Sequence, residues 1–169
     1  TYVILFTIGG ECLGRSPRLA KNTLNNLKTL AGQGVIISDW GGLVTDILNK
    51  KVTVPGSTLT YSKNTFVVAW KASDGFHPNV LSGYITTVMT YCAITGDKAQ
   101  GKAYDFCNDP ALRPSSTSLY YNFDNVIAKY YTKGSTNFKD VFASKTDMSG
   151  IQSLIDAHLA AEAYRNYNY

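Results

Sequence analysis

The stretch Ser73-Asp74-Gly75-Phe76-His77-Pro78-Asn79 joins an apolar run at residues 66–70 to a longer apolar pattern at residues 79–95. The run contains Val and aromatic residues, which favour a β-strand. The longer pattern repeats at the spacing of one helix face. Gly75 and Pro78 interrupt both patterns and predict a loop between them. The segment therefore predicts a strand, a loop and a helix, which is the order of elements in α/β folds.

The first fifty residues show the same alternation. Residues 2–8 and 35–38 are short continuous apolar runs, as expected of strands covered on both faces in a parallel sheet. Residues 18–31 place leucines on one face of an amphipathic helix, and a short helix is expected at 43–48. We therefore predict an α/β fold of three layers, in which an open parallel sheet carries helices on both faces.

The ends of the helix at 79–95 have local signals. Asn79 or Ser82 can cap its start, because a short polar side chain accepts hydrogen bonds from the first free backbone N–H groups. Gly96 is expected to end it, because glycine adopts the left-handed conformation that terminates helices.

The second part of the chain predicts a loop and helices, without further strands. Residues 101–118 contain two prolines and a Ser-rich run and predict a loop. Residues 119–169 predict a helical extension packed on the same domain, with helices at 119–131 and 148–165 and a helical turn at 138–143. The length of 169 residues suits one domain.

Asp74 and His77 are the strongest candidates for chemistry. His77 is one of two histidines in the chain, and imidazole is the side chain best suited to act as a base near neutral pH. A carboxylate beside it accepts from one ring nitrogen and stabilises the imidazolium that forms when the other takes a proton. The alternative is a loop Asp that caps a helix and a surface His.

The Asp-x-x-His-Pro block leading into an apolar helix resembles the last sequence block of the SGNH (GDSL-type) hydrolases. The resemblance covers roughly residues 1–100, which would then be the C-terminal part of a hydrolase-like domain with a flavodoxin-like sheet. It implies that Asp74 orients the imidazole and that His77 is the general base for a serine nucleophile. The implied substrates are acyl esters, including acetyl groups on carbohydrate.

Two blocks of that family are missing from this sequence. It contains neither a Gly-Asp-Ser nucleophile block nor a Gly-x-Asn-Asp block for the oxyanion hole. Thr1 leads directly into an apolar run that is typical of an interior strand. We therefore expect the serine and the oxyanion donors to lie in an N-terminal half of the same protein. The alternative is a complete chain with another fold.

Composition excludes several classes of partner and favours one compartment. The net charge of +4 comes from scattered basic residues, which argues against nucleic-acid binding. No apolar run is long enough to span a membrane. The twelve tyrosines and the low charged fraction of 17% favour an extracellular or periplasmic protein.

The sequence predicts neither a metal site nor a cofactor. Its histidines lie far apart, and Cys12, Cys92 and Cys107 do not have metal-ligand spacing. Three cysteines cannot all pair within one chain. Cys92 is either paired with Cys107 or a buried free thiol in the helix at 79–95.

Other candidate residues have a structural alternative beside the functional one. Trp40, Gly10 and Arg15 follow predicted strands, where α/β sheets place their ligands, and would contribute to substrate binding. Packing of Trp40 in the core is the favoured alternative. His158 lies on the apolar stripe of the last helix and is expected to be a packing residue.

Two functions follow. The first is a serine ester hydrolase to which this chain contributes Asp74 and His77. The alternative is a non-catalytic module that binds glycan or protein, or a degenerate hydrolase without its nucleophile.

Overall fold

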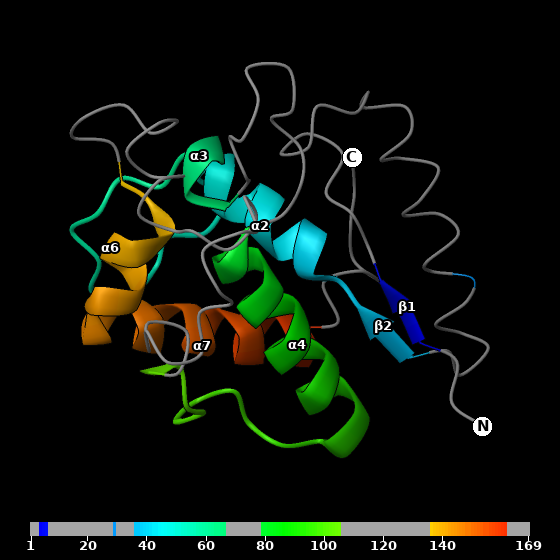
Figure 1. Ribbon diagram of the computed structural model, residues 1–169. Helices are drawn as coiled ribbons and strands as arrows, with labels where there is room; N and C mark the ends of the chain where they lie inside the picture. The colour runs from blue at the N-terminus through cyan, green and yellow to red at the C-terminus, as the bar shows by residue number, and fades with distance from the viewer. Residues whose placement is uncertain (1–3, 7–28, 30–35, 67–78, 106–135, 162–169) are drawn as a thin grey trace, which may run out of the picture.

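The computed structural model describes residues 4–6, 29, 36–66, 79–105 and 136–161. This part of the chain is mostly helical (Figure 1). Its elements are β1 (Ile4–Phe6), β2 (Ile36–Ser38), α2 (Trp40–Leu48), α3 (Lys63–Phe66), α4 (Val80–Thr95), α6 (Phe138–Ala143) and α7 (Lys145–Ala160).

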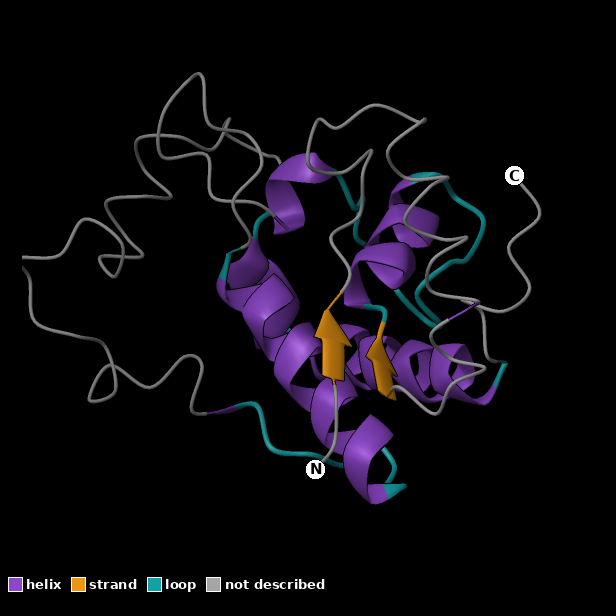
Figure 2. Cartoon of the chain, turned by 90° about the vertical axis from the view of Figure 1, so that its right-hand side faces the viewer, coloured by secondary structure: helices purple, strands orange, loops and turns teal. Residues whose placement is uncertain are grey.

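The predicted three-layer sheet is wrong for the described residues. Only β1 and β2 are strands there, each three residues long, and they pair in parallel with Ile4 opposite Ile36 and Phe6 opposite Ser38. Figure 2 shows the two strands side by side on one side of the helices. The described fold is a helical assembly with a two-stranded parallel ribbon, and no third strand of the described residues extends the ribbon.

The prediction of a strand at residues 66–70 is wrong for Phe66, which is helical. Phe66 is the last described residue of α3, and residues 67–70 lie outside the described residues. The short helix forms because the Thr65 hydroxyl accepts from the backbone N–H of Ser62 at 3.0 Å, while Thr65 N–H donates to the Ser62 carbonyl at 2.9 Å. These local bonds satisfy the first turn and outweigh the β propensity of an aromatic residue.

Capping also moves the start of α2. Asp39 caps this helix, because its carboxylate accepts from Gly42 N–H at 3.2 Å. The helix therefore begins at Trp40, three residues before the expected position, and Gly41 and Gly42 lie within it. Ser144 caps α7 in the same way and starts it at Lys145 instead of residue 148.

Helix α4 confirms the sequence prediction. It spans Val80–Thr95, Asn79 caps its start, and Gly96 ends it in the left-handed conformation with φ of 77°. The helical turn predicted at 138–143 is also confirmed as α6. The helix expected at 18–31 falls almost entirely outside the described residues, and the one at 119–131 wholly so.

One hydrophobic core joins all of the described helices. Helix α4 lies at its centre and contacts β2, α2, α3, α6 and α7. The largest fully buried side chains come from α2, α3, α4, α6 and α7, and they are Leu43, Val44, Phe66, Leu81, Ile85, Met89, Val141, Met148, Ile151 and Ile155. The C-terminal helices thus share a core with α2 and α4.

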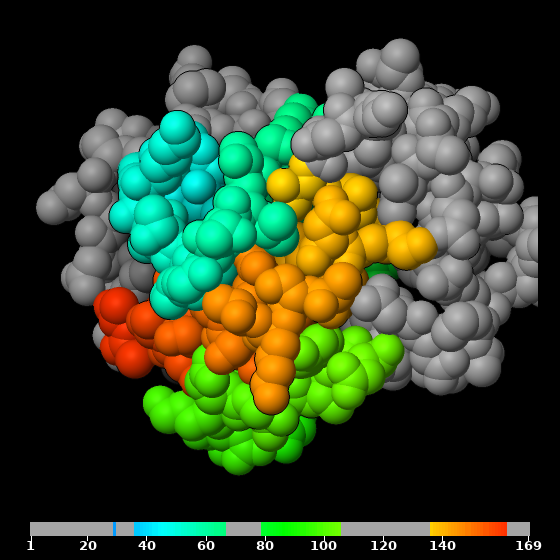
Figure 3. All heavy atoms as spheres, turned by 90° about the vertical axis from the view of Figure 1, so that its left-hand side faces the viewer, coloured from blue at the N-terminus to red at the C-terminus, as the bar shows by residue number. Residues whose placement is uncertain are grey.

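The segment between α2 and α3 lies against the start of α7 (Figure 3). Gly150 permits the close approach, because a Cβ at this position would lie 2.6 Å from Val54 Cγ1 and 2.7 Å from the Pro55 carbonyl oxygen. The buried Asp147 carboxylate accepts from Tyr61 at 2.7 Å and also from Ser57 and Ser144. Burial opposes the charge on Asp147, but these hydrogen bonds outweigh it and hold the pKa of the carboxyl below its ordinary value.

The central position of α4 makes a direct test possible with two isoleucines of that helix. Ile85 is 0% exposed and Ile94 is 42% exposed. We expect Ile85→Ala to lower the free energy of unfolding by about 2–5 kcal/mol, because it removes buried methyl groups and leaves a cavity. The matched control Ile94→Ala should change it by less than about 0.5 kcal/mol. Urea denaturation followed by circular dichroism measures both, and equal losses would contradict the packing described here.

Candidate functional site

The candidate catalytic residues Asp74 and His77 lie outside the described residues, as do Gly10 and Arg15. The structure does describe the residues that flank the Asp–His segment on both sides. Phe66 precedes residues 67–78, and Asn79 follows them. The contacts of these flanking residues are therefore the described part of the candidate site.

Asn79 brings the two ends of the segment together. Its backbone N–H donates to the Phe66 carbonyl at 3.0 Å, and its side-chain amide donates to the Thr65 carbonyl at 2.8 Å. Ser82, in the first turn of α4, donates its hydroxyl to the same Phe66 carbonyl at 2.6 Å. Residues 67–78 therefore leave and re-enter the described structure at one place.

The hydrogen bonds at this place are shielded from water. Asn79 is 6% exposed, and Thr65, Phe66 and Ser82 are buried. A buried polar group that loses its partner has no water to replace it, so breaking any of these bonds costs more than it would at the surface. The two residues that flank the Asp–His segment, Phe66 and Asn79, are therefore held by a small buried polar cluster.

Asn79 uses both ends of its amide. The side-chain oxygen accepts from Leu81 N–H at 3.0 Å and from Ser82 N–H at 3.2 Å, which caps α4. The side-chain nitrogen makes the bond to Thr65. The sequence predicted the cap, but it had no signal for the second bond, because Thr65 lies fourteen residues away on another element.

A groove runs along the exposed face of α4 from the residue that follows Asn79. It has a volume of about 610 Å³. Helix α4 contributes Val80, Gly83, Tyr84, Thr87, Val88 and Tyr91. Among the residues that the structure describes, Lys102 and Ala103 line the opposite side.

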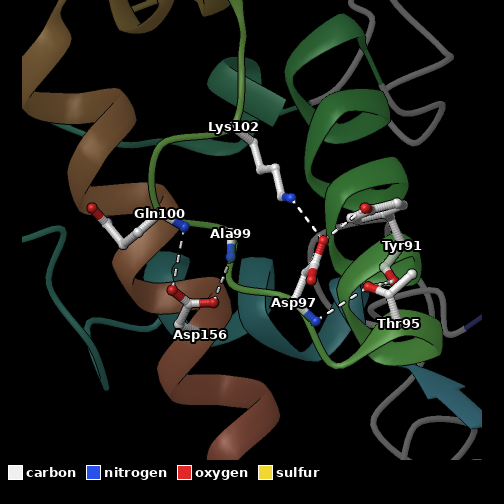
Figure 4. Close-up of polar contacts among 7 residues, drawn as sticks. All are labelled: Tyr91, Thr95, Asp97, Ala99, Gln100, Lys102 and Asp156. Atoms are coloured by element: carbon white, nitrogen blue, oxygen red, sulfur yellow. Dashed lines mark hydrogen bonds and ion pairs between the residues drawn. The ribbon is translucent and has the colours of Figure 1, made fainter.

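Charged groups meet at the Tyr91 end of this groove. The Asp97 carboxylate accepts from Lys102 Nζ at 3.0 Å and from the Tyr91 hydroxyl at 2.7 Å, and Lys102 Nζ lies 4.6 Å from the centre of the Tyr91 ring (Figure 4). The hydrogen bond from Tyr91, followed by that from Lys102, lowers the pKa of Asp97. The bond to Asp97 raises the pKa of Lys102, so the pair stays ionised.

The structure also pairs two buried residues that the sequence analysis treated separately. His158 Nε2 lies 3.0 Å from Asp39 Oδ2, and the two side chains are 6% and 3% exposed. The prediction that His158 is buried on α7 is confirmed, but its partner is 119 residues away and was not predicted. Neither residue lines the groove, so we assign the pair to the packing of α7 against the junction between β2 and α2.

Trp40 and Cys92 have structural positions. Trp40 is 5% exposed and belongs to the hydrophobic core, which favours the packing role over stacking on a sugar. Cys92 is a free buried thiol in α4, and burial raises the pKa of that thiol. Of the two expectations for Cys92, the buried free thiol is the one the structure describes, and Cys107 lies outside the described residues.

The described residues show two absences. Among them, no three or more His, Cys, Asp or Glu side chains gather in a way that could hold a metal ion. Within the same residues, no helix has the length and apolar character needed to cross a membrane.

No family model matches this chain, and comparison with curated proteins and with solved structures gave no match either.

The double use of the Asn79 amide leads to a test by isosteric substitution. Asn79→Asp keeps an oxygen to cap α4 but places a second oxygen against the Thr65 carbonyl in place of a donor. We expect a loss of about 1–3 kcal/mol in the free energy of unfolding, because a buried acceptor is left without its partner. Asn137→Asp, at the N-cap of α6, is the control and should be nearly neutral. Equal stability of Asn79→Asp and the parent, measured by chemical denaturation, would contradict the role given to the amide nitrogen.

The Asp39–His158 pair can be tested by a double-mutant cycle. We expect Asp39→Ala and His158→Ala each to lower the free energy of unfolding, and the double variant to lose less than the sum. The expected coupling is about 1–3 kcal/mol, the range for contacting buried polar residues. A coupling of zero would mean that the two side chains do not interact in solution.

Proposed function

We propose that this protein is a serine ester hydrolase in which His77 is the general base and Asp74 the carboxylate that orients it. The proposal rests on the Asp-x-x-His-Pro block and its likeness to the SGNH hydrolases, and it does not depend on the sheet expected for that family. The observation that supports it best is the closure of residues 67–78 at Asn79.

These hydrogen bonds fix the position of the residues on either side of the proposed catalytic segment. A base and its orienting carboxylate work only when they are held in a narrow range of positions, so the elements beneath them must be rigid. His77 precedes Asn79 by two residues in the sequence. Because Asn79 is buried, caps α4 and binds Thr65, the chain that follows the proposed base has little freedom to move.

The proposed reaction has two steps. In the first, His77 takes the proton of a serine hydroxyl as the oxygen attacks the ester carbonyl, and then gives that proton to the leaving alcohol. In the second, His77 takes a proton from water, the resulting hydroxide attacks the acyl-serine, and the serine leaves with the proton restored. Asp74 stabilises the imidazolium in both steps.

The proposal assigns neither the nucleophile nor the oxyanion hole to residues of this sequence. No serine here stands in a Gly-Asp-Ser or Gly-x-Ser-x-Gly block. Ser82 is buried and donates to the Phe66 carbonyl, so its hydroxyl is already used in the fold. The activity must therefore be measured on the full-length natural protein.

The two histidines of the chain allow a matched test of the proposed base. We expect His77→Ala to reduce kcat for p-nitrophenyl acetate about 10²- to 10⁴-fold, the usual contribution of a general base, with unchanged circular dichroism. His158→Gln, which keeps a nitrogen donor toward Asp39, should lower stability while it leaves kcat within about threefold of the parent.

Near-normal turnover in His77→Ala would exclude the assignment. A parent protein that hydrolyses no ester at all would favour the non-catalytic binding module.

A further inference from the structure

We propose that the groove along α4 binds an aliphatic acyl chain longer than acetyl, as the substrate subsite of the proposed esterase. This inference rests on the proposed function for the identity of the substrate. Three observations carry it: the position of the groove, the chemistry of its lining and the rigidity of its walls.

The groove begins where the candidate catalytic segment ends. Val80, the first residue of α4, is one of its lining residues and directly follows Asn79. Tyr91 lies eleven positions further along the same helix. At about 1.5 Å per residue, the groove therefore follows roughly 16 Å of α4, starting beside Asn79. An alkyl chain bound in it would lie along the helix.

The lining favours a neutral hydrocarbon. The Tyr84 hydroxyl accepts from Gln152 Nε2 at 2.7 Å, and the Lys102 ammonium and the Tyr91 hydroxyl are both bound to Asp97. Apart from the Thr87 hydroxyl, the polar side chains of the described lining are engaged within the protein, so a sugar in the groove would give up hydrogen bonds to water without full replacement. An alkyl chain loses none and gains from burial.

The wall opposite α4 is held in place by α7. Asp156 accepts from the backbone N–H groups of Ala99 at 2.7 Å and Gln100 at 3.3 Å, as Figure 4 shows. Gln152 accepts from Gly101 N–H at 3.0 Å and donates to the Lys102 carbonyl at 2.7 Å. When the walls of a site are already ordered, binding loses less free energy to the ordering of side chains and loops.

Gly83 provides the means to fill the groove without disturbing the fold. No heavy atom lies within 4 Å of a Cβ built at this exposed position, and glycine is a weak helix former. Gly83→Leu therefore adds bulk to the groove and raises helix propensity at once. Ala157→Leu, at an exposed position of α7 that does not line the groove, is the matched control.

The test compares long and short ligands in these two variants of the full-length protein. We expect Gly83→Leu to lower kcat/KM for p-nitrophenyl octanoate tenfold or more relative to p-nitrophenyl acetate, since displacing about two buried CH₂ groups is sufficient for that loss. It should also abolish binding of 2-nonanone, a neutral ketone that is not hydrolysed, as measured by NMR titration. Ala157→Leu should keep both properties.

An unchanged octanoate-to-acetate ratio together with unchanged ketone binding in Gly83→Leu would overturn the proposed subsite. So would a change of oligomeric state on that substitution, measured by light scattering, because it would show that the groove is an interface between copies.

The ketone separates this inference from the proposed function. If the parent binds 2-nonanone in a Gly83-dependent way but hydrolyses neither ester, the groove is an alkyl-binding site and the esterase proposal fails. If hydrolysis depends on His77 but the ketone does not bind, the groove assignment fails and the esterase proposal stands.

Discussion

The side chain of Asn79 sets the start of α4, and the rest of the described structure is arranged around that helix. Its oxygen caps the first turn, and its nitrogen binds the Thr65 carbonyl. Helix α4 then contacts β2, α2, α3, α6 and α7, so a shift in its position would disturb each of these contacts. One amide therefore links the end of α3, the start of the central helix and the return of residues 67–78.

The candidate site combines a rigid, buried polar cluster with an open apolar groove. The buried cluster of Thr65, Phe66, Asn79 and Ser82 holds the point at which the Asp–His segment meets the fold. The groove along α4 starts at that same point. The point at which the Asp–His segment meets the described structure thus adjoins the groove, as the proposed esterase requires.

The second Asp–His pair shows why chemistry cannot be assigned from residue type alone. Asp39 and His158 have the geometry of a carboxylate beside an imidazole, yet both are buried and Asp39 also caps α2. Their contact stabilises the packing of α7. Asp74 and His77 are three positions apart in the chain and are proposed for catalysis on the basis of the block in which they stand. Asp39 and His158 meet only through folding.

Local chemistry in the sequence was sufficient to predict α4 with its Asn79 cap and Gly96 end, the turn of α6 and the burial of His158. Each of these depends on neighbours within a few residues or on the helical spacing of apolar side chains. The same local signals could not decide whether a larger sheet forms. A short apolar run such as residues 66–70 fits a strand or a buried helix equally well. Only the tertiary structure decided that Asn79 binds Thr65 and that Asp39 meets His158, since those outcomes rest on hydrogen bonds between segments that lie apart in the sequence.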